Sequence, residues 1–271
     1  MPVIHHLNCG TMCPHAGTAL GLVDRDAGHL VARCLLIEAA DGLVLIDTGY
    51  GTGDVATPSR LGPARFLLGA RLAHEETAVA QVRALGHDPA DVRDVLVTHL
   101  DLDHAGGLGD FPNATVHLHR REHEFLRGGS AKAKLRYRPG QLAHGPRYQT
   151  HEVTGEAWFG LERVRLLEGL DVEIAMIPLH GHTPGHTGYA VNTGDGWLLH
   201  AGDTYLRREE IEGGPVPRAL RIYHQGNSIA EKDRRANVER LTELRARHGE
   251  EVTVFCSHDA TELARDRAAG A

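Results

Sequence analysis

The segment HLDLDHAGG, residues 99–107, places two histidines and two aspartates directly after the apolar run DVLVT. A short continuous apolar run of this kind predicts a buried β-strand. Because side chains alternate along an extended chain, His99, Asp101 and Asp103 should project to one side of it. His104 follows where the chain turns, and the glycines after it permit a tight turn. Imidazole and carboxylate groups are common metal ligands, so this stretch predicts a metal site at a strand end.

Histidine is frequent throughout the chain, at 20 of 271 residues, and it clusters with aspartate and glycine. Three further clusters each follow an expected strand: HGHTPGHTG at 180–188, HAGDTY at 200–205 and CSHDATE at 256–262. Loops at one edge of a sheet commonly build one site, so these clusters should meet segment 99–107. The alternative for any single cluster is an ordinary solvated loop.

Composition and charge limit the classes of partner. The formal net charge of -7 argues against nucleic acid or an anionic membrane surface, and favours a small-molecule substrate. No stretch is long and apolar enough to cross a bilayer, and the N-terminus lacks a secretory pattern, so we expect a cytoplasmic protein. The four cysteines are too few for a disulfide framework. Cys9 and Cys13 with His6 and His15 are an alternative metal site, but a turn is favoured because their spacing fits no standard zinc pattern.

The expected elements alternate between apolar runs and helical patterns. We expect strands over residues 30–38, 42–47, 94–98, 115–119, 171–178, 188–191, 197–201 and 252–256. Helices are expected over residues 75–85, 120–126 and 231–248, and candidate loops or lids over 51–69, 128–155 and 207–227. Runs of strands with interspersed helices predict two β-layers covered by helices, within one domain spanning residues 1–271.

The order and separation of the motifs LIDTG, HLDLDHAGG, GHTPGH, GD and SHD resemble the metallo-β-lactamase superfamily over nearly the whole chain. Within it, the sequence is most similar to the N-acyl-homoserine lactone and related lactone hydrolases. The resemblance implies an α/β protein with an αββα four-layer sandwich. It also implies a metal-dependent hydrolase in which a metal-bound hydroxide cleaves an ester-like bond, with a lactone as the expected substrate.

Other activities remain open alternatives: a thioester or phosphodiester hydrolase, a diiron redox protein, or a ligand-binding module without catalysis. The chain contains no GxSxG motif, which argues against a serine hydrolase of the nucleophile-elbow type.

The resemblance further implies a binuclear centre with seven ligands. One ion would be bound by His99, Asp101 and His182, the other by Asp103, His104 and His258, and both by Asp203. Zinc is the expected metal. Asp47, at the end of LIDTG, would support a ligand by hydrogen bonding, with a turn carboxylate as the alternative. His180 and His186 would have positioning or structural roles.

Asp101 departs from the family pattern, which usually has histidine at this position. The carboxylate removes one positive charge from the centre. Because oxygen is a harder ligand than imidazole nitrogen, iron or manganese becomes an alternative to zinc. A carboxylate here also resembles the flavodiiron proteins, which is the origin of the redox alternative.

The expected catalytic groups are Asp103, Asp203 and Tyr205. Either aspartate could pass a proton to the leaving group, and Tyr205 could donate to the developing oxyanion or the leaving alkoxide. Tyr205 lies two residues after Asp203, whereas the family tyrosine lies three residues after it, so ordinary packing is the alternative.

Two further stretches have alternative interpretations. The basic segment 120–138 could capture an anionic substrate, form a solvated surface, or contribute to the subunit contact of a homodimer. Phe66, Leu67 and Leu68 could line a mouth for an acyl chain or belong to a core helix.

Overall fold

The computed structural model describes residues 2–152, 155, 157–162 and 172–269. Its first sheet consists of β1 (Val3–Met12), β2 (Leu30–Ala39), β3 (Gly42–Ile46), β4 (Val92–Leu96), β5 (Thr115–His119) and β6 (Arg147–His151), in that spatial order. The second consists of β12 (Val252–Phe255), β11 (Trp197–His200), β10 (Thr187–Asn192) and β9 (Ile174–Pro178). β7 (Ala157–Trp158) and β8 (Leu161–Glu162) pair with each other.

Helices connect and cover these sheets. They are α1 (Gly17–Leu20), α2 (Thr52–Ala56), α3 (Ala64–Leu68), α4 (Ala78–Ala84), α5 (Arg120–Arg127), α6 (Ala131–Arg136), α7 (Glu209–Glu212), α8 (Arg218–Asn227), α9 (Glu231–His248) and α10 (Ala260–Ala269). Short 3₁₀ turns are η1 (Pro58–Leu61), η2 (His74–Glu76), η3 (Pro89–Asp91) and η4 (Gly106–Asp110). Among the described helices, none has the length and apolar character needed to span a membrane.

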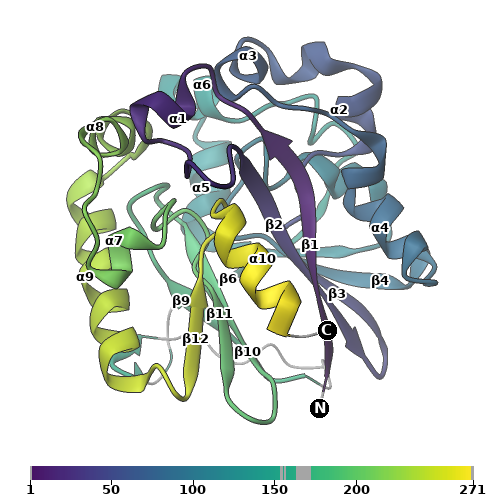
Figure 1. Cartoon of the computed structure of the whole chain (residues 1–271). Coiled ribbons are helices and arrows are strands. Elements are labelled where there is room, and N and C mark those ends of the chain that lie inside the picture. The colour runs from purple at the N-terminus through teal and green to yellow at the C-terminus, as the bar shows by residue number, and fades with distance from the viewer. Residues whose placement is uncertain (1, 153–154, 156, 163–171, 270–271) are drawn as a thin grey trace.

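The two larger sheets pack face to face because their strands are apolar on both faces. Along β2, Leu35 and Ile37 point into the core between the sheets, whereas Cys34 and Leu36 point towards α4. The second sheet packs its other face against α9 through Leu241 and other apolar residues. Figure 1 shows α4 and α9 on opposite sides of the molecule, with the sheets between them. This arrangement confirms the predicted αββα sandwich.

The expected strands are all present, with small shifts in their ends. β4 is displaced by two residues from the predicted strand 94–98. β9 begins at Ile174 rather than at residue 171, which lies outside the described residues. Helix α9 has the predicted bounds. The expectation that residues 51–69, 128–155 and 207–227 are loops was wrong in part, because they contain α2, α3, α6, β6, α7 and α8; residues 153 and 154 lie outside the description. The sequence analysis also missed β1 and α10.

The strand order brings the histidine-rich segments to one end of the sandwich. Strands β3, β4, β5 and β6 are parallel, so their carboxyl ends lie at the same edge, and β11 and β12 are also parallel. At this edge the backbone N–H of Thr187 in the second sheet donates to the carbonyl of Thr98, after β4, at 3.0 Å. The loops of both sheets therefore meet here.

Glu122, in the first turn of α5, accepts hydrogen bonds from the loops after β4 and β9. Its carboxylate is buried and accepts hydrogen bonds from the N–H of Leu100, the Tyr137 hydroxyl, the Thr183 hydroxyl and the N–H of Gly185, at 2.6–3.1 Å. Position 185 must be glycine, since a Cβ there would lie 2.2 Å from the backbone nitrogen of Glu122. The carboxylate therefore holds segments 99–107 and 180–188 against the same helix.

Glu122→Ala should lower the free energy of unfolding by about 3 kcal/mol, because it leaves several buried donors without an acceptor. Urea unfolding of the metal-loaded protein measures this loss. Glu124→Ala is the matched control on the same helix; its side chain is exposed, so we expect a change within about 0.5 kcal/mol. Equal unfolding midpoints for the two variants would show that Glu122 does not stabilise the loops.

Candidate metal centre

Seven histidine and aspartate side chains from both sheets converge at these strand ends. Six of them form two groups, and within each group the ligand atoms lie within 4.8 Å of one another. The first group is His99, His182 and Asp203, and the second is Asp103, His104 and His258. Asp101 lies beside the first group, with its Oδ2 3.2 Å from His99 Nε2 and 3.1 Å from His182 Nε2. The structure thus brings together every residue that the sequence analysis proposed as a metal ligand.

The orientation of two imidazoles is fixed by their Nδ1 atoms. His104 Nδ1 donates to Asp47 Oδ2 at 2.8 Å, and His258 Nδ1 donates to the carbonyl of Val31 at 2.6 Å. A neutral imidazole that donates through Nδ1 keeps its Nε2 lone pair free, so both Nε2 atoms are available as ligands. The position of Asp47 is the one expected of a residue that supports a ligand. Its second contact, from the Thr98 hydroxyl at 2.8 Å, joins it to segment 99–107.

Asp203 lies between the two groups. Its Oδ1 is 3.1 Å from His258 Nε2 and 3.3 Å from His104 Nε2, while its Oδ2 is 3.4 Å from His182 Nε2 and 3.9 Å from His99 Nε2. Oδ2 is also 3.2 Å from His258 Nε2. The carboxylate thus lies within reach of the imidazoles of both groups, as a bridging ligand would.

Buried polar atoms that make no hydrogen bond show whether the site is suited to metal ions. Among the described residues, His99 Nε2, His104 Nε2 and Asp203 Oδ1 are buried and make no well-formed hydrogen bond, although each lies within 3.3 Å of another candidate ligand atom. Buried polar atoms without partners are costly in a folded protein, and a cation bound between them would remove that cost. Imidazole nitrogen and carboxylate oxygen together are a donor set suited to divalent ions.

The electrostatics of the centre also favour bound positive charge. Burial acts to raise the pKa of Asp203, but His258 and His104 hold it well below its ordinary value. Burial acts to lower the pKa of His104, yet Asp203 and Asp47 raise it well above the ordinary value. Burial raises the pKa of Asp103. The carboxylates thus create a negative environment that stabilises cations.

Arg136 pairs with the unusual Asp101. From the end of α6, its Nε donates to Asp101 Oδ1 at 2.5 Å and its Nη2 donates to Oδ2, while Nη1 donates to the carbonyl of Asn227. Nη2 also lies against His182 Nε2. Although burial opposes it, the charge of Arg136 holds the pKa of Asp101 well below its ordinary value. The guanidinium thereby returns the positive charge that the aspartate removes.

The sequence analysis placed Arg136 only within a basic segment. The available signal was Asp101 itself, because a buried carboxylate in place of a histidine requires a cation nearby.

His186 and His180 lie outside the ligand groups. His186 donates through Nδ1 to the carbonyl of Leu179 at 2.9 Å, and its Nε2 accepts the backbone N–H of Asp203 at 2.8 Å, which positions Asp203. His180 contacts the carbonyl of His186 through Nδ1 at 3.1 Å. The alternative cysteine site is not among the metal-binding groups within the described part of the chain, and His6 instead accepts a hydrogen bond from Arg33.

A cleft of about 210 Å³ opens beside the two ligand groups. Its polar side includes Asp101, Asp103, Arg136, Asp203 and His258, and its apolar side includes Met12, Leu30, Leu67, Leu68 and Leu206. The expectation that segment 66–68 lines a mouth therefore fits Leu67 and Leu68, whereas Phe66 does not line the cleft and is 69% exposed. Two residues of α8, Tyr223 and Asn227, complete the wall.

Comparisons with known proteins agree with this geometry. Residues 27–246 match the family model of the metallo-beta-lactamase superfamily. A probable metallo-hydrolase of Mycobacterium tuberculosis is 38% identical over 269 residues, covering 98% of this chain and 83% of the relative.

The chain belongs to the metallo-β-lactamase superfamily and is a metallo-hydrolase. An N-acyl homoserine lactonase of Azorhizobium caulinodans is 34% identical over 58% of this chain and 57% of the relative. The structure of an N-acyl homoserine lactone hydrolase with its product N-hexanoyl-L-homoserine at the catalytic metal centre superposes with a TM-score of 0.70. That superposition has 20% identity and covers 97% of this chain and 95% of the other. It shows that the two share the metallo-β-lactamase fold.

Tyr205 lies away from the cleft of this superfamily member. Its side chain has no exposed surface, packs in the core beneath α9, and donates its hydroxyl to Glu262 Oε1 at 3.1 Å. The structure thus places Tyr205 in the packing environment that was the alternative to a catalytic role. Tyr223 is the tyrosine that lines the cleft. The sequence analysis missed it because it treated residues 207–227 as a loop rather than recognising helix α8.

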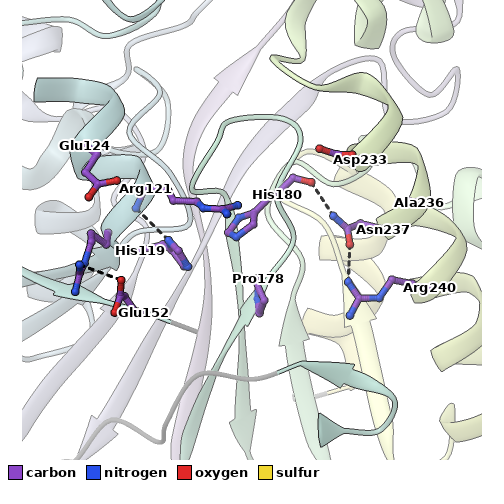
Figure 2. A pocket seen from close by; sticks show the side chains of 11 residues that line it. His119, Arg121, Glu124, Glu152, Pro178, His180, Asp233, Ala236, Asn237 and Arg240 are labelled. Carbon is purple, nitrogen blue, oxygen red and sulfur yellow. Dashed lines mark hydrogen bonds and ion pairs between the residues drawn. The ribbon is translucent and has the colours of Figure 1, made fainter. Parts of the chain in front are cut away.

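A larger cavity, of about 660 Å³, lies between α5 and α9 (Figure 2). Its lining includes His119, Arg120, Arg121, Glu124, His180 and Arg240. The seven predicted ligands are not among its lining residues. The basic segment 120–138 is therefore divided: Arg120 and Arg121 face this cavity, and Arg136 faces the metal centre. Charges of both signs line the cavity, and Arg120 pairs with Glu152 at 3.0 Å.

Glu262, the partner of Tyr205, makes stability depend on pH. Burial raises its pKa from 4.5 to about 7, although the N–H of Cys256 donates to it. The protonated form therefore favours folding: its contribution is complete below pH 4.5 and is lost as the pH rises to about 7. Across this range, Glu262→Gln should gain stability relative to the wild type, by on the order of 3 kcal/mol. Chemical unfolding at several pH values measures this difference, and parallel stability curves would contradict it.

Proposed function

We propose that this metallo-hydrolase opens a lactone ring, of the N-acyl-homoserine lactone type, at a centre of two divalent ions, with zinc as the expected metal. The observation that carries the proposal is the cleft itself, in which the polar centre adjoins a wall of leucine and methionine side chains. A lactone with an acyl chain combines a polar ester with an apolar tail and would fit both sides. The lactonases among the relatives support the choice of substrate.

Each of the two groups of side chains would bind one ion. His99, Asp101 and His182 would hold one ion, Asp103, His104 and His258 the other, with Asp203 between them. When bound, such ions polarise the substrate carbonyl and lower the pKa of a water molecule, so that hydroxide is available near neutral pH.

Asp103 and Asp203 have different parts in proton transfer. The pKa of Asp203 is held low by His258 and His104, so this residue stays a carboxylate between the two groups. Asp103 lines the same cleft as Asp203 but does not lie between the two groups. We infer that Asp103 delivers a proton to the ring oxygen as the ester C–O bond breaks.

Tyr223 is the donor that we infer for the developing oxyanion or the leaving alkoxide. Burial, together with Asp103 and Asp203, raises the pKa of its phenol, so the hydroxyl remains protonated. Asn227 Nδ2 donates to the Tyr223 oxygen at 3.2 Å, which leaves the O–H free to point into the cleft. An activated water would supply the nucleophile, and Leu67 and Leu68 would position the acyl chain.

The redox alternative receives no support from an observation specific to this structure. It depended on Asp101, and the charge of that carboxylate is matched by Arg136.

A lactone panel tests the proposed activity, with thioester and phosphodiester substrates alongside. We expect the metal-loaded protein to hydrolyse one or more lactones and Asp203→Ala to lose that activity. In the same assay, Tyr223→Phe should lower kcat by roughly 10–100-fold with a smaller effect on KM, because its contact forms mainly in the transition state. Tyr205→Phe is the matched control and should retain kcat, since this residue does not line the cleft.

Two outcomes would contradict these assignments. Turnover of a thioester or phosphodiester without turnover of any lactone would remove the substrate proposal but leave the metallo-hydrolase intact. A larger loss of kcat in Tyr205→Phe than in Tyr223→Phe would reverse the roles of the two tyrosines.

Metal content tests the role of Asp101. Asp101→Ala should bind one metal equivalent fewer than the wild type, because the second ion of the cleft keeps Asp103, His104 and His258. Elemental analysis of protein freed of loosely bound ions measures the stoichiometry. Asp101→His should restore the second equivalent and shift preference towards zinc.

The double variant Asp101→Ala with Arg136→Ala separates two explanations. If Asp101 is a ligand, the double variant stays one equivalent below the wild type, since the ligand is still absent. If Asp101 only neutralises Arg136, removing both charges returns the metal content to that of the wild type. The second result would contradict ligation by Asp101.

A further inference from the structure

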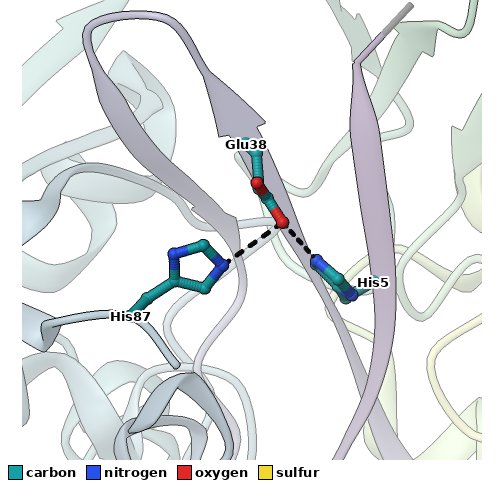
Figure 3. A group of neighbouring side chains, drawn as sticks. All are labelled: His5, Glu38 and His87. Atoms are coloured by element: carbon teal, nitrogen blue, oxygen red, sulfur yellow. Dashed lines mark hydrogen bonds and ion pairs between the residues drawn. The ribbon is translucent and has the colours of Figure 1, made fainter. Parts of the chain in front are cut away.

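A second set of metal-binding side chains lies far along the first sheet from the catalytic cleft. It consists of His5 on β1, Glu38 on β2 and His87 in the connection after α4 (Figure 3). His5 Nε2 lies 2.7 Å from Glu38 Oε1, and His87 Nε2 lies 3.2 Å from the same oxygen. The two imidazole rings are 6.3 Å apart between centroids. Three separate segments of the chain therefore aim ligand atoms at one point.

The strand register explains why these residues meet. His5 is opposite Leu36, and Glu38 is opposite Val3, so His5 and Glu38 are diagonal neighbours on the same face of the sheet. Further along this face, Leu36 belongs to the core that packs against α4. His87 follows the end of that helix. His5, Glu38 and His87 thus lie on this face of the sheet, just beyond the end of its apolar core.

We propose that His5, Glu38 and His87 bind a zinc ion as a structural site, separate from the catalytic centre. Zinc binds imidazole nitrogen and carboxylate oxygen at about 2.0–2.2 Å, so two ligands of one tetrahedral ion lie roughly 3.4 Å apart. The observed spacings of 2.7 and 3.2 Å reach this value with a small shift of the Glu38 side chain. The three side chains are 25–35% exposed, so water can complete the coordination and the ion can enter.

The bound ion would cross-link β1, β2 and the connection between α4 and β4. Glu38 pairs with Leu43 at the start of β3, whereas the catalytic end begins at Asp47, about 13 Å further along the strand. The two sites therefore share no ligand. Because an ion that binds only the folded chain stabilises it by mass action, zinc should raise the stability without changing hydrolysis.

Zinc content after equilibrium dialysis at a fixed free Zn²⁺ concentration tests the site, with untagged protein whose catalytic centre is already loaded. We expect His87→Ala to hold one equivalent less than the wild type and to retain its hydrolytic activity. His248→Ala is the matched control. His248 also contacts a carboxylate, Glu251, at 3.1 Å, but it belongs to none of the metal-binding groups found within the described ranges. It should bind as much zinc as the wild type.

Glu38→Gln provides a second variant that keeps the size of the side chain and removes its charge. It should also lose one zinc equivalent, together with the rise in Tm that added Zn²⁺ gives the loaded wild-type protein. The alternative is a purely hydrogen-bonded group, in which each imidazole donates to Glu38. Equal zinc content in the wild type, His87→Ala and Glu38→Gln would establish that alternative, and loss in only one variant would rule out a three-ligand site.

Discussion

The carboxylate of Asp203 is the contact on which the metal centre depends, because it joins the loops of the two sheets. It follows β11 of the second sheet, yet its oxygens face imidazoles that come from both sheets. The backbone N–H of Asp203 donates to His186 Nε2, and Arg234 donates to the carbonyl of the next residue, Thr204, at 2.6 Å. A buried carboxylate is costly without positive charge nearby, and His104 and His258 supply some of it, so a cation bound beside Asp203 would stabilise the centre further.

Asp101, a proposed ligand, is paired with Arg136 within the same cleft. Replacing the usual histidine by aspartate lowers the charge of the centre, and an arginine from α6 restores it through two contacts with the carboxylate. The pair also places a guanidinium on the cleft wall, where a substrate carbonyl or a product carboxylate would lie within its field. Arg136 thus pairs with Asp101 and lines the cleft at the same time.

The side chains that converge at the candidate centre could be selected from the sequence because they occur in short motifs directly after strands. Tyr223 could not be found in this way, since it reaches the cleft through helix α8, whose contribution depends on tertiary packing. Strand β1 was missed because the alternation along VIHHLNCGTM is weak, and its place at the sheet edge comes from backbone pairing with β2. The short helices α2 and α3 have too few residues to show a helical period.

A crystal structure of the metal-loaded protein, with anomalous scattering recorded at the absorption edge of the metal, tests the centre most directly. We expect two anomalous peaks in the cleft, both in contact with Asp203. One should be enclosed by His99, Asp101 and His182, and the other by Asp103, His104 and His258. A single peak, or a guanidinium of Arg136 in place of the first ion, would contradict a binuclear centre built on these seven residues.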